Sequence, residues 1–337
     1  MLDQIKSVML LYLSYERNRK QWNIRILILS LICGAACLLL AFKTKGRVQH
    51  YFEPIMVSLP DMSSGEIDLL TYNIAGLPEL ISSARTPRES SIQTIGQKVN
   101  RFDIVNIQED FNYNKFLYLE NLHPYRTPNM GGVPFGDGLT TLSKYPIMKF
   151  DRVAWKDCNG ADCLTPKGFS YARIQLAKDV FLDVYNVHAT AQDDGKSINA
   201  RKNNFKQLAS YILEYSACQP ILLMGDFNAH YSFEREWIKE FQEQVDVMDS
   251  WVILQNQGSF PDITKNFKPQ HALYTTDKCE SIDKIYFRNS DHLILTPNTY
   301  KVENQLFQNE FGEPLSDHCA ISLKLTWQSV KSVGTNR

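Results

Sequence analysis

Six short polar segments lie at the ends of apolar runs in this 337-residue chain. They are built mainly from Asn, Asp, Glu, Gln, Ser and His. A carboxylate or histidine beside a buried strand is costly unless it pairs, hydrogen-bonds or binds metal. Six such segments therefore predict strand ends that converge on one divalent cation and one phosphate group. The segments are Thr71-Tyr72-Asn73-Ile74, Ile107-Gln108-Glu109, Asn186-Val187-His188, Gly225-Asp226-Phe227-Asn228, Ser281-Ile282-Asp283 and Ser316-Asp317-His318.

The composition fits a globular protein with a sizeable core, since 44% of the residues are hydrophobic and 22% are charged. The net charge is −1 overall, but residues 1–42 carry five basic and two acidic side chains. The remainder is therefore acidic. Domains that bind nucleic acid usually show a basic excess, because phosphate contacts supply much of the affinity. The charge balance argues against nucleic acid as a partner.

The N-terminal region contains one long apolar run. Residues 26–42 have no charged side chain, which is close to the ~20 residues needed to cross a bilayer. We predict a basic tail over 1–22 and a transmembrane signal-anchor helix over 23–42. The basic residues before the run predict a cytoplasmic N-terminus and a periplasmic, luminal or extracellular remainder. A buried core helix and a cleaved signal peptide, with secretion, are the alternatives.

After the apolar run we predict a linker over 43–65, a catalytic domain over 66–327 and a polar tail over 328–337. Several predicted strands adjoin each other without an intervening helix, so a purely alternating βαβ sheet is not expected. An α/β fold with two sheets and helices on their outer faces fits better. Strands are predicted at 67–72, 104–107, 139–142, 169–176, 181–187, 221–224, 282–287 and 319–325, and helices at 90–102, 198–215 and 234–245.

Two cysteines, Cys158 and Cys163, bracket a short turn-forming loop. If the domain lies outside the cytosol, a local disulfide is expected. The alternatives are two unrelated thiols or a zinc site. No second Cys or His pair lies nearby, which argues against zinc.

Oxygen ligands for a hard cation stand at two of the strand ends. Asn73 and Glu109 offer an amide and a carboxylate oxygen, which are ligand types that Mg²⁺ uses. Asp226 and Asn228 are two residues apart, so in extended chain they share one face and can point at one ligand. A simple turn explains the Asp226–Asn228 pair equally well.

Two histidines, His188 and His318, also stand at strand ends. Hydrolysis of a phosphate ester needs one group to take a proton from water and another to stabilise or protonate the leaving oxygen. Asp283 lies in an apolar strand and would be a costly buried carboxylate unless it accepts a histidine N–H. Such a bond fixes the histidine tautomer.

Together, the six segments in this order resemble the endonuclease/exonuclease/phosphatase superfamily over about residues 66–327. The resemblance implies a four-layer α/β/β/α sandwich with a Mg²⁺-dependent site at the strand ends, where Mn²⁺ can substitute. It also implies that Glu109 is the main metal ligand, and that Asn73 and Asp317 lie at the metal.

The same resemblance implies roles for the other side chains. Asp226 and Asn228 would orient water and phosphate. His318 would be the general base, with Asp283 as its partner. His188 would bind the phosphate or act as general acid.

Three stretches are similar to neutral sphingomyelinases, which release the phosphorylated headgroup of a phospholipid. In one of them Lys167 could present a positive charge to the phosphate, although a turn lysine is the alternative. Inositol-polyphosphate phosphatases of the superfamily carry a different segment where this chain has Ser281-Ile282-Asp283-Lys284. The stretches are Gln108-Glu109-Asp110-Phe111-Asn112, the segment from Thr165 to Ala172, and the segment from His188 to Asp194.

Three functions follow as hypotheses. The first is a membrane-anchored, Mg²⁺-dependent phosphodiesterase that hydrolyses sphingomyelin or a related phospholipid. The second is a nuclease or phosphomonoesterase of the same superfamily, which nicking of plasmid DNA would favour. The third is a catalytically silent lipid-binding module. Lipid binding without turnover, unchanged in Glu109→Ala and His318→Ala variants, would favour it.

Overall fold

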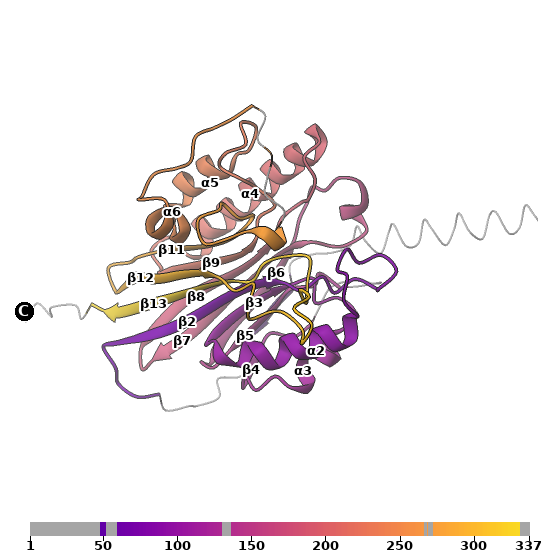
Figure 1. The fold of residues 1–337 in the computed structure, drawn as a ribbon. Helices are drawn as coiled ribbons and strands as arrows, with labels where there is room; N and C mark the ends of the chain where they lie inside the picture. The colour runs from indigo at the N-terminus through magenta and orange to yellow at the C-terminus, as the bar shows by residue number, and fades with distance from the viewer. Residues whose placement is uncertain (1–47, 52–58, 130–135, 266–267, 269–271, 331–337) are drawn as a thin grey trace, which may run out of the picture. The chain divides into compact units, whose positions relative to one another are not determined.

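The computed structural model describes residues 48–51, 59–129, 136–265, 268 and 272–330. Within these residues two β-sheets face each other, and helices cover the outer face of each (Figure 1). Each sheet contains one parallel pair of strands among antiparallel pairs. The prediction of two mixed sheets flanked by helices is therefore confirmed.

The first sheet has seven strands in the order β1-β6-β7-β8-β9-β11-β10. Only β8 and β9 are parallel. The strands are β1 Val48–Tyr51, β6 Ile147–Ala154, β7 Gly168–Ala177, β8 Val180–His188, β9 Ile221–Asp226, β10 Met248–Asp249 and β11 Asp283–Arg288.

The second sheet has six strands in the order β12-β13-β2-β3-β5-β4. Here only β2 and β3 are parallel. The strands are β2 Ser64–Asn73, β3 Ile104–Gln108, β4 Tyr125–Arg126, β5 Thr140–Ser143, β12 Leu293–Val302 and β13 Ile321–Ser329.

The helices form the two outer layers. In Figure 1, α4, α5 and α6 lie on the side of the first sheet, and α2 and α3 lie on the side of the second. The Asp194 side chain caps α4 by accepting the backbone N–H groups of Lys196 and Ser197, which an N-cap requires. The helices are α2 Arg88–Lys98, α3 Asn114–Leu119, α4 Gly195–Tyr215, α5 Ile238–Val245 and α6 Ser250–Gln255, with short 3₁₀ helices η1 Val99–Arg101, η2 Gly160–Cys163 and η3 Ala272–Tyr274.

Strand β2 shows how the layers are joined. Ile67 and Leu69 belong to the core shared with the first sheet, whereas Leu70 and Tyr72 pack with the α2 side. All four are buried. Fully burying an apolar side chain of this size contributes about 1.5–3 kcal/mol, so both faces hold this strand in place.

Buried amide side chains connect the two sheets. Asn106 Nδ2 donates to the carbonyl oxygen of Tyr185 at 2.9 Å, and Asn186 Nδ2 donates to that of Ile107 at 2.9 Å. Gln108 Nε2 donates to Asn186 Oδ1 at 2.7 Å. Because an unsatisfied buried amide is costly, these bonds favour one register of sheet against sheet.

All eight predicted strands and three predicted helices are present, with ends shifted by a few residues. The range predicted as a linker, 43–65, contains β1, which pairs with β6, and the first residues of β2. The apolar pattern does not predict β12, because this edge strand alternates buried and exposed residues and contains Pro297. Strand β13 ends at Ser329, inside the range predicted as a polar tail.

Among the residues that the structure describes, no helix has the length and apolar character needed to cross a membrane. The predicted tail 1–22 and the predicted span 23–42 lie outside the described residues.

Candidate active site

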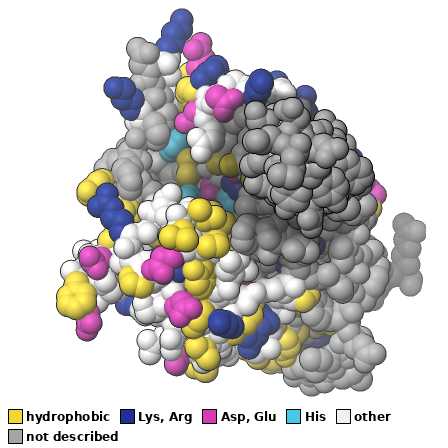
Figure 2. Space-filling view, turned by 90° about the vertical axis from the view of Figure 1, so that its right-hand side faces the viewer, with side chains coloured by type: hydrophobic (Ala, Val, Ile, Leu, Met, Phe, Trp, Pro, Cys, Tyr) yellow, Lys and Arg dark blue, Asp and Glu magenta, His cyan; other side chains and the backbone are white. Residues whose placement is uncertain are grey.

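The strand register brings the predicted residues to one end of both sheets. Asp226 pairs with His188 on one side and with Asp283 on the other, so three of them lie on adjacent strands. In the second sheet, Asn73 ends β2 and His318 precedes β13. Figure 2 views this end, where acidic and histidine side chains lie in a hollow with hydrophobic side chains beside it.

Asn73 links two of the carboxylates. Its Nδ2 donates to Glu109 Oε1 at 3.0 Å and to Asp226 Oδ2 at 3.2 Å. Its Oδ1 accepts the backbone N–H of Ala75 at 3.1 Å. In this arrangement Asn73 orients the two carboxylates, and its role as an oxygen ligand of a metal stays a prediction.

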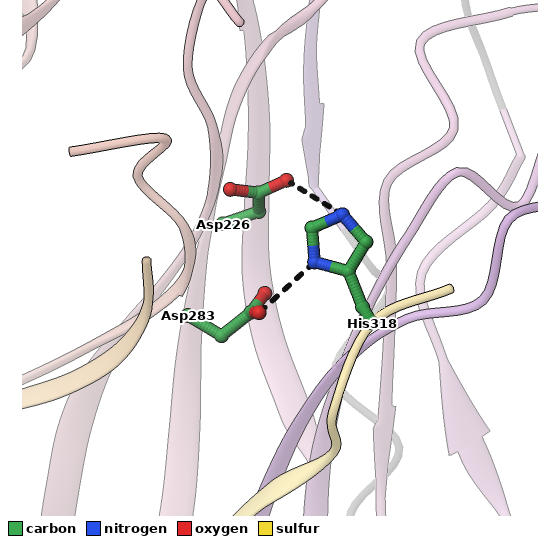
Figure 3. Close-up of side chains that lie close together, drawn as sticks. All are labelled: Asp226, Asp283 and His318. Carbon is green, nitrogen blue, oxygen red and sulfur yellow. Dashed lines mark hydrogen bonds and ion pairs between the residues drawn. The ribbon is translucent and has the colours of Figure 1, made fainter. Parts of the chain in front are cut away.

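His318 lies between two carboxylates (Figure 3). Its Nδ1 is 3.0 Å from Asp283 Oδ2, and its Nε2 is 3.8 Å from Asp226 Oδ2. Burial by itself would lower the pKa of His318, but the charges of Asp283 and Asp226 outweigh it and hold this pKa well above its usual range. Asp283 therefore occupies the position expected of a partner that holds the imidazole.

His188 faces the same carboxylates from β8. Its Nε2 is 3.5 Å from Asp226 Oδ2 and 3.9 Å from Glu109 Oε1. Burial, with the positive charges of Lys167 and His318, lowers the pKa of His188 well below its usual range. Trp155 Nε1 donates to the carbonyl oxygen of His188 at 2.7 Å and so fixes the backbone there.

The carboxylates at this end fit a divalent cation. Burial raises the pKa of Glu109, and it raises the pKa of Asp226 to about 6 against the opposing charge of His318. Asp283 Oδ1 is buried without a hydrogen-bond partner. Hard oxygen donors that are costly to ionise without a counter-charge are the set that Mg²⁺ or Mn²⁺ would stabilise.

A compact group of possible ligand atoms is formed by Asp226, Asp283 and His318, which lie within 4.8 Å of one another. We do not interpret these three residues as the ligands of one metal ion. We interpret them as a histidine and the carboxylates that hold it. Asp283 already engages His318 Nδ1, and an imidazole that faces carboxylates with both nitrogens is arranged for proton transfer. Glu109 and Asp226, which share the Asn73 amide, are the better candidates to hold the metal.

Two other predicted residues, Asn228 and Asp317, lie around this group. Asn228 Nδ2 donates to the carbonyl oxygen of Ala189 at 3.1 Å, and its backbone N–H donates to Asp226 Oδ1 at 2.9 Å. Asp317 is half-buried, and its Oδ1 accepts a hydrogen bond from Ser316 Oγ at 3.4 Å. Its place at the metal stays a prediction.

Lys167 is buried, and its Nζ lies 3.0 Å from Asp162 Oδ1. Cys158 and Cys163 form a disulfide, as predicted, in the loop that carries Asp162. The charge of Lys167 reaches the site, because it adds to the lowering of the His188 pKa by burial and opposes the rise that burial causes in the pKa of Glu109. The structure thus places the Lys167 ammonium group at the edge of the cluster of carboxylates.

Backbone conformation also shapes the site. Glu109 and Asn228 adopt left-handed φ angles of 61° and 50°, which non-glycine residues rarely do. Such angles persist only where the surroundings impose them, and they gather at functional sites. Gly76 packs against the carbonyl of Glu109 so closely that a Cβ there would overlap it. Glu109 is therefore held by its backbone as well as by Asn73.

The residues that support the site were not predicted from the sequence. Arg201, on α4, is fully buried and donates to Glu236 and to the carbonyl oxygens of Thr190 and Gln192 at 2.8 Å each. It therefore holds the loop that follows His188. A single arginine within a helical pattern gives no signal of this role. In contrast, the polar Asn106 stands out inside an apolar strand, and this could have indicated that it bonds to the other sheet.

Comparison with known proteins agrees with this geometry. The profile of the endonuclease/exonuclease/phosphatase family matches residues 70–318. The chain belongs to this family. Proteins named sphingomyelinase from Mycobacterium bovis and Mycobacterium tuberculosis are 38% identical over 265 residues, which is 77% of this chain and 52% of theirs. The chain thus spans about half of the length of these relatives.

Solved structures share the fold at lower identity. Sphingomyelinase C from Streptomyces griseocarneus has a TM-score of 0.56 at 20% identity, and covers 77% of this chain and 99% of its own. A beta toxin from Staphylococcus aureus with bound magnesium ions has a TM-score of 0.57 at 17% identity, with the same coverage. D. rerio TDP2 with a single-strand DNA product reaches 0.56 at 14%, covering 77% and 98%. The fold alone does not choose between lipid and DNA.

Proposed function

We propose that this protein is a Mg²⁺-dependent phosphodiesterase that hydrolyses sphingomyelin or a related phospholipid and releases its phosphorylated headgroup. The observation that carries this proposal is the meeting of Glu109, His188, Asp226 and the Asp283–His318 pair at one end of the two sheets. The choice of substrate rests on the 38% identity to sphingomyelinases, since the fold is shared with a DNA-bound protein.

In this proposal Glu109 and Asp226 hold the cation, with Asn73 orienting both. When bound, Mg²⁺ would offset the negative charge of the phosphate and polarise it. Mn²⁺ would substitute, because it accepts the same oxygen donors. Lys167 would add a second positive charge beside the phosphate.

His318 would take the proton from the attacking water through Nε2, while Asp283 holds its Nδ1–H. A base must be neutral, so the raised pKa of His318 has to fall in the working enzyme. A metal ion held by Glu109 and Asp226 would bring positive charge close to His318 and so lower its pKa. Because its pKa is lowered, His188 would be neutral and would suit a hydrogen bond to the phosphate better than proton donation.

The protein would work at a membrane surface. The predicted anchor would keep the catalytic domain at the bilayer that contains its substrate, on the non-cytoplasmic side.

Exposed apolar side chains at the site end support work at a lipid surface. Six of the eight large hydrophobic side chains that are more than half exposed in the described residues lie on connections at this end. A membrane surface would cover them on docking. They are Leu80, Ile81, Leu164, Ile263, Tyr274 and Phe311.

Headgroup release tests the proposal directly. Purified protein with Mg²⁺ is given sphingomyelin vesicles, phosphatidylcholine, lyso-lipids, inositol phosphates and plasmid DNA in parallel. We expect phosphocholine release from sphingomyelin, lost in His318→Ala and Glu109→Ala variants that keep the wild-type Tm. Nicking of DNA without headgroup release would replace the proposal with a nuclease. Lipid binding without any turnover would replace it with a lipid-binding module.

A further inference from the structure

Arg88 is a buried cation whose hydrogen-bond partners are all neutral. Its residue surface is 0% exposed, and it begins α2. Nε donates to the carbonyl oxygen of Thr86 at 3.1 Å, and Nη2 donates to Thr86 Oγ1 at 2.8 Å. Nη1 donates to the carbonyl oxygen of Ile74 at 3.1 Å, and Nη2 to that of Leu315 at 2.8 Å. Burying a guanidinium is costly, so its position calls for a reason.

Two of these carbonyls belong to the segments that carry the site. Ile74 directly follows Asn73, and Leu315 directly precedes Ser316, Asp317 and His318. The planar guanidinium therefore joins two chain segments at fixed separation. Ser316 provides a second link, since its Oγ donates to the carbonyl oxygen of Asn73 at 2.7 Å although they are 243 residues apart.

The β-sheet pairing between β2 and β13 does not extend to these two segments. The pairing of β13 with β2 ends at Ile321 and Thr71. His318 and Leu315 lie beyond that pair, and yet Asn73 Nδ2 is 3.5 Å from His318 Nε2. A shift of 1 Å in such an arrangement costs up to about 10²-fold in rate.

We propose that Arg88 is a positioning residue that sets the spacing between the Asn73 end of β2 and the His318 turn, and thereby couples the metal-binding half of the site to the general base. Arg88 touches neither substrate nor metal in this proposal and acts through the backbone of Ile74 and Leu315. This role of Arg88 rests on the proposed function only where kcat and KM are measured.

The alternative is that Arg88 only stabilises the fold, and the chain offers a matched control for it. Arg288 is also buried, and it donates to the backbone carbonyls of Val245 at 2.8 Å, of Gln219 at 3.3 Å and of Ser216. It ends β11, five residues beyond Asp283, roughly 17 Å along the strand. Arg288→Lys is the same chemical change at the opposite end of the sheet.

The test compares full-length Arg88→Lys, Arg288→Lys and wild type below the temperature at which any of them unfolds. Three quantities are measured: the Tm, kcat and KM for sphingomyelin vesicles, and Mn²⁺ affinity by calorimetry without substrate. Lysine keeps the positive charge, but its ammonium group cannot donate to two carbonyl oxygens in the fixed planar geometry of a guanidinium. For Arg88→Lys we expect kcat to fall by about 10- to 100-fold with KM within about two-fold, and Mn²⁺ affinity to fall by about 10-fold.

Arg288→Lys should lower the Tm and leave kcat and Mn²⁺ affinity at wild-type values. Equal losses of kcat in the two variants, or wild-type kcat and Mn²⁺ affinity in folded Arg88→Lys, would overturn the proposal. If the wild type turns over no phospholipid, the proposed function fails, and Mn²⁺ affinity still decides the role of Arg88. If Arg88→Lys does not fold, Ser316→Ala removes the second link and should show the same pattern at smaller size; wild-type kcat and Mn²⁺ affinity there would also refute it.

Discussion

Oδ2 of Asp283 lies 3.0 Å from Nδ1 of His318, although 35 residues separate them in the sequence. The pair joins the two sheets, because Asp283 begins β11 of the first sheet and His318 precedes β13 of the second. A carboxylate here fixes which imidazole nitrogen carries the proton and leaves Nε2 directed toward Asp226.

Replacing this carboxylate tests its role. Asp283→Asn keeps the size of the side chain but removes the charge that raises the pKa of His318 and favours the Nδ1–H tautomer. We expect kcat to fall by about 10²–10⁴-fold, as for the loss of a general base. Phosphocholine release with Mg²⁺ measures it, with the Tm as control. A folded variant with wild-type kcat would exclude Asp283 as the partner of His318.

Metal binding should be visible without turnover. A ligand that binds only the folded state stabilises it by about 2.7 kcal/mol at 100 times its Kd. We expect Mg²⁺ and Mn²⁺ to raise the Tm, EDTA to reverse the rise and abolish activity, and Zn²⁺ to give no recovery of activity. Calorimetric scans with each ion measure the shift.

Glu109→Gln keeps the hydrogen bond from Asn73 but loses the charge, so its Tm should no longer respond to Mg²⁺. Glu120→Gln, on the exposed surface, is the control and should respond as wild type does. If Glu109→Gln showed the full Mg²⁺ response, Glu109 would not be a metal ligand.

The sequence predicts the strands of the site well for a physical reason. Strands such as 221–224 are buried on both faces and therefore appear as continuous apolar runs, so a polar residue such as Asp226 marks the end of the strand. Arg88 and Arg201 give no comparable signal, because their partners are backbone carbonyls or distant side chains that only the fold brings near. Strands β6 and β12 are missed because several of their residues are partly or fully exposed, which interrupts the apolar run.

A pH-dependent loss of stability is expected from His123, which bonds to Asn121 and Phe102 and to none of the catalytic groups. Its Nε2 lies 3.0 Å from the carbonyl oxygen of Phe102, and its Nδ1 lies 2.9 Å from Asn121 Nδ2. The neutral ring satisfies both, donating through Nε2 and accepting through Nδ1. Protonation would place an N–H on Nδ1 against the amide donor. Burial accordingly lowers the pKa of His123.

Since the folded-state pKa of His123 lies below its unfolded value of about 6.5, its contribution to stability is present above that pH. It is lost as the pH falls toward the folded-state pKa. Urea unfolding at about pH 7.5 and about pH 5.5 should show a larger loss for wild type than for His123→Gln. Equal losses in the two proteins would show that another group titrates.

The exposed apolar side chains at the site end give the last prediction. Leu80 is 99% exposed and Phe311 is 78% exposed, on the β2–α2 and β12–β13 connections. If they enter the lipid surface, each contributes at least about 1.5 kcal/mol of burial, or roughly ten-fold. Leu80→Ser with Phe311→Ser should therefore lower the rate on sphingomyelin vesicles by at least about ten-fold. The rate on a monomeric short-chain sphingomyelin should be unchanged.

The matched control is Leu119→Ser with Leu122→Ser, because these side chains are 63% and 79% exposed but lie away from the site: Leu119 ends α3, and the Leu122 N–H donates to Asn100 Oδ1. The control should match wild type on both substrates. A loss confined to vesicles, and to the variants at the site end, would mean that lipid is reached through this face. Equal loss in both pairs would attribute the effect to general solubility, and equal loss on both substrates would place Leu80 and Phe311 in the chemistry of the site instead.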